Sequence, residues 1–70
     1  MEDKQKILDA LCKALQLTRG QADLVSLTYH RQSEDREEVI VKYTSGNARR
    51  INTSLDSGLA MIRDVCEHIG

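Results

Sequence analysis

Two stretches of this chain alternate apolar and polar residues, and their parities match. The apolar sets are Val25, Leu27 and Tyr29 in the first stretch and Val39, Val41 and Tyr43 in the second. A period of two is typical of strands with one buried face. A hairpin centred on Glu34 places Val25 opposite Tyr43, and the other apolar pairs follow in order. The sequence therefore predicts an antiparallel pair whose apolar side chains share one face.

A third strand is predicted over residues 48–53, after the turn signal Ser45–Asn47. Its one large apolar residue, Ile51, should face inward near Tyr43. The outer face would then carry Lys42, Arg50 and Asn52. The same residues also suit a loop, but two strands alone would be a poor platform for helices.

An amphipathic helix is predicted before the strands. Its apolar stripe consists of Ile7, Leu8, Leu11, Cys12 and Leu15. These positions recur every three or four residues, as on one face of a helix. Asp3 is placed to cap the start, and Gly20 lies past the end, where a left-handed cap residue is common.

A second helical pattern closes the chain. Its apolar seam consists of Leu55, Leu59, Ile62, Cys66 and Ile69, widened on one side by Met61 and Val65. Thr53 or Ser54 is expected to cap this helix. Asp56 would lie in the first turn, where the positive end of the helix dipole favours an acidic side chain.

These elements predict an α+β protein with the order α-β-β-β-α. Two apolar helix stripes need cover and the sheet offers one apolar face, so we expect a three-stranded antiparallel meander with both helices packed on one face. The chain has 70 residues and shows no linker, repeat or low-complexity segment. A single domain covering residues 1–70 is expected.

Composition narrows the function classes. Ten Lys and Arg stand against eleven Asp and Glu, so no strong net charge attracts nucleic acid or a membrane. With two Tyr and no Phe or Trp, the core must be small and aliphatic, near the size at which a fold needs extra support. A homodimer is one way to supply that support. No signal peptide or membrane span is apparent, so a cytoplasmic location is expected.

No catalytic constellation is apparent. Cys12 and Cys66 lie on apolar stripes, where burial makes a thiol inert, and their spacing is not that of a zinc or redox pair. His30 should face Glu38 across the sheet as an ion pair. His68 and Cys66 are two residues apart on a helix, so they do not easily share a metal. We therefore expect no enzyme activity, no cofactor, no metal and no small-molecule site.

Gly58 stands out because glycine in a first helical turn costs about 1 kcal/mol relative to alanine. One interpretation is that the missing side chain lets another element pack closely. The other is a helix-start site for an anion, formed by Ser54, Asp56, Ser57 and Gly58. The negative charge of Asp56 favours the packing interpretation.

The expected order of elements resembles the topology of the double-stranded RNA-binding domain. That resemblance implies RNA contacts through the first helix, the first loop between strands and the start of the last helix. Lys4, Lys6 and Lys13 on the first helix suit that role. The loop at residues 33–38 is acidic, as is the helix start at Asp56, so both would repel phosphates. Nucleic-acid binding is therefore the alternative function.

The leading expectation is a small non-catalytic protein that binds a protein partner or a second copy of itself. The candidate surface is the outer face of the sheet, with Leu24, His30, Ile40, Lys42, Arg49 and Arg50. Exposed apolar side chains among polar ones are typical of protein-binding surfaces, and also of an ordinary solvated face.

Overall fold

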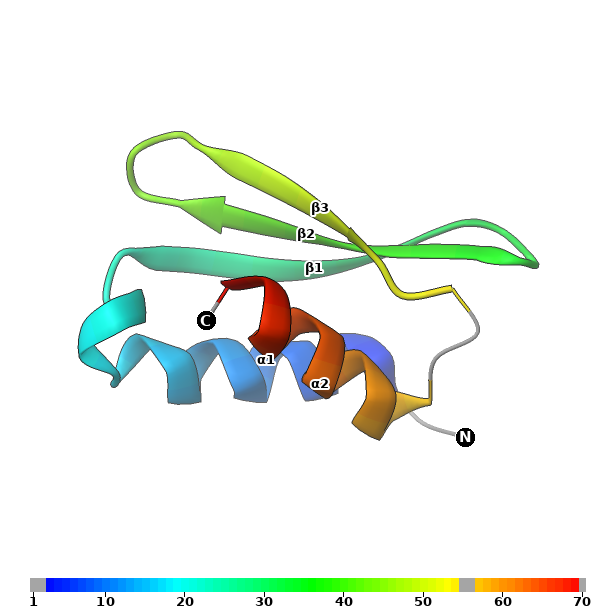
Figure 1. The fold of residues 1–70 in the computed structure, drawn as a ribbon, viewed down its shortest axis with the longest axis horizontal. Coiled ribbons are helices and arrows are strands. Elements are labelled where there is room, and N and C mark those ends of the chain that lie inside the picture. The colour runs from blue at the N-terminus through cyan, green and yellow to red at the C-terminus, as the bar shows by residue number, and fades with distance from the viewer. Residues whose placement is uncertain (1–2, 55–56, 70) are drawn as a thin grey trace.

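The computed structural model describes residues 3–54 and 57–69, and it has the expected order of elements. The elements are α1 (Lys4–Gln16), the short 3₁₀ helix η1 (Arg19–Gln21), β1 (Leu24–Ser33), β2 (Arg36–Tyr43), β3 (Ala48–Asn52) and α2 (Gly58–Ile69). The strands form one antiparallel sheet in the order β1-β2-β3. Both helices lie on the same side of this sheet (Figure 1). The α+β prediction is confirmed.

The core lies between the sheet and the two helices. Its buried apolar side chains are Leu8 and Cys12 from α1, Met61 and Val65 from α2, and Leu24, Leu27, Val39, Val41 and Ile51 from the strands. Full burial of one such aliphatic side chain contributes roughly 1.5–3 kcal/mol, so this cluster is the main source of stability. None of the described helices is long and apolar enough to cross a membrane.

The predicted hairpin register is correct over most of β1 and β2 and wrong at one end. Leu27 lies opposite Val41, as expected, but the ladder is irregular between Leu24 and Ser26. Leu24, and not Val25, therefore lies opposite Tyr43. An extra residue at such an irregularity moves the preceding side chains to the other face. Leu24 is 2 % exposed and Val25 is 48 % exposed, so the predicted exposure of Leu24 was wrong.

The third strand is confirmed, and Ile51 faces the core. Its predicted position near Tyr43 was wrong, because Ile51 lies opposite Val39. The β2–β3 hairpin closes at Tyr43, whose amide donates to the carbonyl of Asn47 at 3.0 Å. Gly46 adopts a φ of 90° in this turn, a left-handed conformation that glycine tolerates best.

Helix α1 begins as predicted and ends differently. The Asp3 carboxylate accepts a hydrogen bond from the Lys6 amide at 3.1 Å and so caps the start. The end is capped by Leu17 in a right-handed conformation. Gly20 lies beyond it in η1 and not at a left-handed cap, because the Thr18 amide already donates to the carbonyl of Leu15 at 2.9 Å.

Helix α2 begins later and is rotated from its predicted orientation. The Ser57 hydroxyl accepts a hydrogen bond from the Ala60 amide at 3.2 Å, so Ser57 caps the helix, and not Thr53 or Ser54. The buried residues are Gly58, Met61 and Val65, whereas Leu59 and Cys66 of the predicted seam are exposed. Leu55 and Asp56 lie outside the described residues. Two apolar stripes run along this helix, and the sheet covers the one that holds Met61 and Val65.

Candidate interaction surface

Side chains of α1 cover part of the outer edge of β1. Gln5 makes two of these contacts: its Nε2 donates to the carbonyl of Leu27 at 3.1 Å, and its Oε1 accepts from the amide of Tyr29 at 2.8 Å. Gln16 Nε2 donates to the carbonyl of Leu24 at 2.8 Å. Backbone groups that would otherwise be available to another strand are therefore occupied.

The outer edge of β3 is open. The Thr53 amide donates to the carbonyl of Glu37 at 3.1 Å, and Asn47 accepts from Tyr43 at the other end of the pair. In an antiparallel ladder the residues that bond a given neighbour alternate along the strand. The backbone groups that point away from β2 therefore belong to Ala48, Arg50 and Asn52. Within residues 3–54 and 57–69 these groups have no hydrogen-bond partner. No other element lies beyond β3 in Figure 1.

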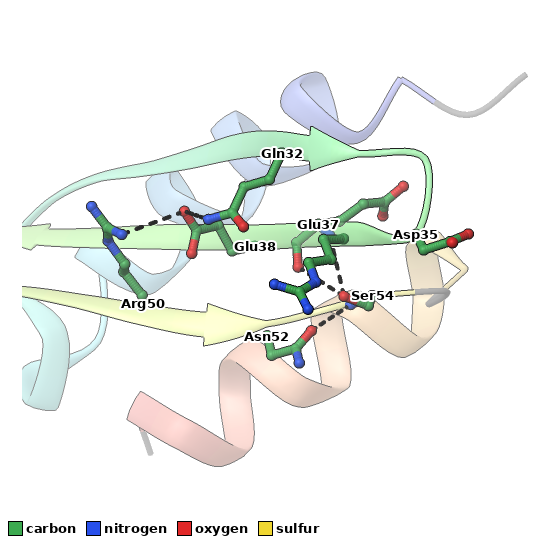
Figure 2. Close-up of a pocket in the computed structure, with 8 residues that line it drawn as sticks. Gln32, Asp35, Glu37, Glu38, Arg50, Asn52 and Ser54 are labelled. Atoms are coloured by element: carbon green, nitrogen blue, oxygen red, sulfur yellow. Dashed lines mark hydrogen bonds and ion pairs between the residues drawn. The ribbon is translucent and has the colours of Figure 1, made fainter.

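Glu38 is the centre of a polar network on the outer face of the sheet. It accepts a hydrogen bond from His30 Nδ1 at 3.1 Å. It also accepts one from Gln32 Nε2 at 3.0 Å, and Arg50 Nη1 lies 3.9 Å away (Figure 2). The hydrogen bond from His30 is the main cause that lowers the pKa of Glu38. Because an ionised carboxylate only accepts hydrogen bonds, this contact requires a proton on Nδ1 of His30. The predicted pairing of His30 with Glu38 is confirmed.

Two hollows lie beside the ends of β3. The one at the β1–β2 hairpin is lined by Gln32, Asp35, Arg36, Glu38, Arg50 and Asn52, among others (Figure 2). The one at the β2–β3 turn is lined by Asp23, Tyr43, Ser45, Asn47, Ala48 and Arg49. Both mix acidic with basic side chains, so neither is a strong site for a small ion. Both border the open edge, where they provide space for side chains of a bound segment.

The predicted surface residues are divided between the two faces of the sheet. His30, Ile40, Lys42 and Arg50 share the outer face, and Ile40 is half-buried there. Leu24 lies in the core instead. Arg49 lies opposite the buried Val41, on the helix side, and its Nη1 donates to the carbonyl of His68 at 3.2 Å.

The residues of the predicted helix-start site hold the junction between β3 and α2. Ser54 Oγ accepts a hydrogen bond from the Glu37 amide at 3.2 Å, and the Ser54 amide donates to Asn52 Oδ1 at 2.9 Å. Ser57 caps the helix and Gly58 is buried. Asp56 lies outside the described residues.

The two thiols differ. Cys12 is 7 % exposed, and burial raises the pKa of its thiol, as expected for a core residue. Cys66 is exposed, so its predicted burial was wrong. Among the described residues, no three His, Cys, Asp or Glu side chains are grouped closely enough to hold a metal ion.

An ion pair occupies one of the lysines that would contact RNA. Lys4 Nζ lies 2.6 Å from Glu37 Oε2 and 5.6 Å from the centre of the Tyr29 ring. The hydrogen bond from Lys4 is the main cause that lowers the pKa of Glu37. Lys4 therefore already binds an acidic group of its own chain.

The two edges of the sheet were not foreseen from the sequence. Gln5 and Gln16 are eleven residues apart, about three helical turns, and so lie on the same side of α1. That spacing was the available signal for a partly covered β1 edge. No protein family matches this chain, and neither does a curated protein or a solved structure. Function therefore has to be inferred from the geometry of the sheet and the helices.

Proposed function

We propose that the protein is a non-catalytic interaction module that binds an extended segment of another protein along β3. The supporting observation is the contrast between the two edges, since α1 covers part of the β1 edge while the outward backbone groups of β3 have no partner in the described chain. We place the module in the cytoplasm, in keeping with two free cysteines, Cys12 and Cys66.

The open edge suits strand addition. Each outward residue of β3 offers an amide donor and a carbonyl acceptor to an incoming strand. In this mode of recognition, backbone hydrogen bonds provide affinity and pockets for alternate side chains provide specificity. The hollows beside Asn52 and Ala48 lie where such side chains would be received.

The charge of the strand indicates an acidic partner. β3 contains Arg49 and Arg50 and no acidic residue, and Lys42 lies next to it on the outer face. Glu38, which lies opposite Asn52 of β3, already accepts hydrogen bonds from two side chains. Pairing β3 with the same strand of a second copy would bring like charges together, which is unfavourable.

A peptide titration tests the proposal. The probe is a synthetic peptide of alternating Val and Glu, and a peptide of alternating Val and Lys is its control. The acidic peptide should shift the backbone amide resonances of Ala48, Arg50 and Asn52, and it should protect them from hydrogen exchange. The basic peptide should leave all three unchanged.

Two variants of Arg50 distinguish the contribution of backbone hydrogen bonds to peptide binding from the contribution of the side-chain charge. Arg50→Pro removes an outward amide and spares the bonds to β2, because proline is tolerated on an edge strand. It should abolish binding, whereas Arg50→Ala should only weaken it. Binding that survives Arg50→Pro, or shifts confined to Thr28, Ile40 and Lys42, would show that the edge is not the site.

Duplex RNA is the probe that tests the alternative function, nucleic-acid binding. We expect the protein not to bind it at moderate salt. The exposed loop residues Glu34 and Asp35 would repel phosphates, and Lys4 is paired with Glu37. Micromolar RNA binding that weakens steeply with added salt would replace the peptide proposal with the nucleic-acid alternative.

A further inference from the structure

Helix α2 carries an apolar stripe that the core does not use. Leu59 is 72 % exposed, Ile62 is half-buried and Cys66 is exposed. None of the three belongs to the buried cluster or to the half-buried side chains that pack on it. Residues three and four apart share one side of a helix, so the three form a continuous strip.

The strip lies beside the buried stripe and not opposite it. Ile62 and Cys66 each follow a core residue, Met61 and Val65, and successive side chains are about 100° apart around a helix. The strip thus extends the apolar surface of α2 beyond the part that the sheet covers.

Two side chains of opposite charge lie along the side of the strip that faces away from Met61 and Val65. Arg63 and Glu67 are both exposed and lie one turn apart. Neither forms an ion pair in the part of the chain that the structure describes. A basic and an acidic residue on the same border are self-complementary when two copies of the helix run antiparallel, because each then meets the other's opposite charge.

We propose that this strip is the contact between two copies of the chain, with their α2 helices packed antiparallel about a two-fold axis. Cys66 lies against Ile62 of the second copy, and Arg63 lies within a turn of Glu67 of the second copy. In a two-fold contact the same patch is used by both subunits, which the paired charges satisfy. The contact also adds buried apolar area to a small core, and short chains bury a smaller fraction of their surface than long ones.

This contact does not depend on strand addition at β3. Met61 and Val65 hold α2 against the sheet, and the strip lies on another side of the helix. The outer sheet face is on the opposite side of the sheet from the helices (Figure 1). A dimer formed in this way therefore leaves two outer sheet faces accessible.

Sedimentation equilibrium over a range of protein concentrations tests the proposal. The wild-type protein should be a dimer at high concentration. Leu59→Glu should raise the dimer dissociation constant by about tenfold or more, since it places a charge in an apolar contact. Leu17→Glu is the matched control, because Leu17 is 89 % exposed at the end of α1, and the substitution should leave the dimer intact. A circular dichroism spectrum should show both variants folded.

The thiol of Cys66 gives a second measurement. Its rate of labelling by a maleimide should fall as the wild-type concentration rises, and it should not change with concentration in Leu59→Glu. A wild-type protein that stays monomeric at high concentration, or a dimer that Leu59→Glu leaves unchanged, would overturn the proposal. Peptide binding by Leu59→Glu or Leu17→Glu is measured separately from dimerisation. Failure of the dimer proposal can therefore be distinguished from failure of the strand-addition proposal.

Discussion

Gln5 occupies the position of a neighbouring peptide group beside Tyr29. Its side-chain oxygen accepts from the Tyr29 amide at 2.8 Å, and its side-chain nitrogen donates to the Leu27 carbonyl at 3.1 Å. One amide thus satisfies a donor and an acceptor, as an adjacent strand would. On β3, by contrast, the outward backbone groups of Ala48, Arg50 and Asn52 have no side-chain partner within residues 3–54 and 57–69, so the two edges differ in how much of their backbone is covered.

Replacement of Gln5 by alanine should destabilise the fold by about 1–3 kcal/mol, because it leaves two backbone groups of β1 without their partner. Urea denaturation measures this change in the free energy of unfolding. Lys6→Ala is the control, since Lys6 is exposed on the same helix and should change stability by no more than about 0.5 kcal/mol. Equal stability of the two variants would show that water replaces the glutamine without cost.

The ion pair between Lys4 and Glu37 should make stability depend on pH. The pKa of Glu37 is lower in the folded protein than its ordinary value, mainly through the hydrogen bond from Lys4. Its contribution is therefore present above the ordinary pKa and is lost as pH falls through the lowered pKa. The wild type should be more stable than Glu37→Gln at neutral pH, and the difference should shrink between about pH 6 and about pH 3.

Thermal unfolding of both proteins across that range measures the effect. Glu34→Gln is the control, because Glu34 is exposed in the β1–β2 turn. The melting temperature of Glu34→Gln should change with pH in the same way as that of the wild type. A difference between the wild type and Glu37→Gln that does not change with pH would rule out a stabilising charge on Glu37.

The two thiols should react at very different rates in dilute native protein. Cys66 is exposed and should be labelled quickly, whereas burial and the raised pKa of its thiol protect Cys12. Mass spectrometry should show one label on the native protein and two after unfolding. Cys66→Ser should remove the fast label. Fast labelling of Cys12 would indicate that α1 detaches readily from the sheet.

The sequence was sufficient where the signal is local and periodic. The alternation around Leu27 and Val41 determined the register of the hairpin, and a carboxylate at Asp3 determined where α1 begins. Each of these features depends on a few neighbouring residues, so it can be inferred without knowledge of the rest of the fold.

The sequence was insufficient where tertiary contacts choose between local options. Helix α2 has two adjacent apolar stripes, and only the position of the sheet decides that Met61 is buried while Leu59 is exposed. The irregularity near Leu24 is not marked by any particular residue type in β1. The burial of Leu24 and the exposure of Val25 could therefore not be foreseen. The open edge of β3 depends on backbone groups, which every residue type shares.

Gly58 is the position where packing and helix propensity make opposite predictions. It is buried on the stripe of α2 that faces the core, together with Met61 and Val65. If the glycine allows close packing, Gly58→Ala adds a methyl group to a filled space. Overpacking costs about 1–3 kcal/mol, which exceeds the helix-propensity gain of at most about 1 kcal/mol. The melting temperature of Gly58→Ala should therefore fall.

Gly20→Ala is the matched control for this substitution. A Cβ at Gly20 would meet no atom within 4 Å, and its backbone is not left-handed. Alanine there should leave the protein as stable or raise its stability by about 0.4–1 kcal/mol, because it restricts the unfolded chain. A higher melting temperature for Gly58→Ala would contradict the packing interpretation, since only a site with room for the methyl group gains from the substitution. The beginning of α2, with Ser54, Ser57 and Gly58, would then have to be tested again as a binding site.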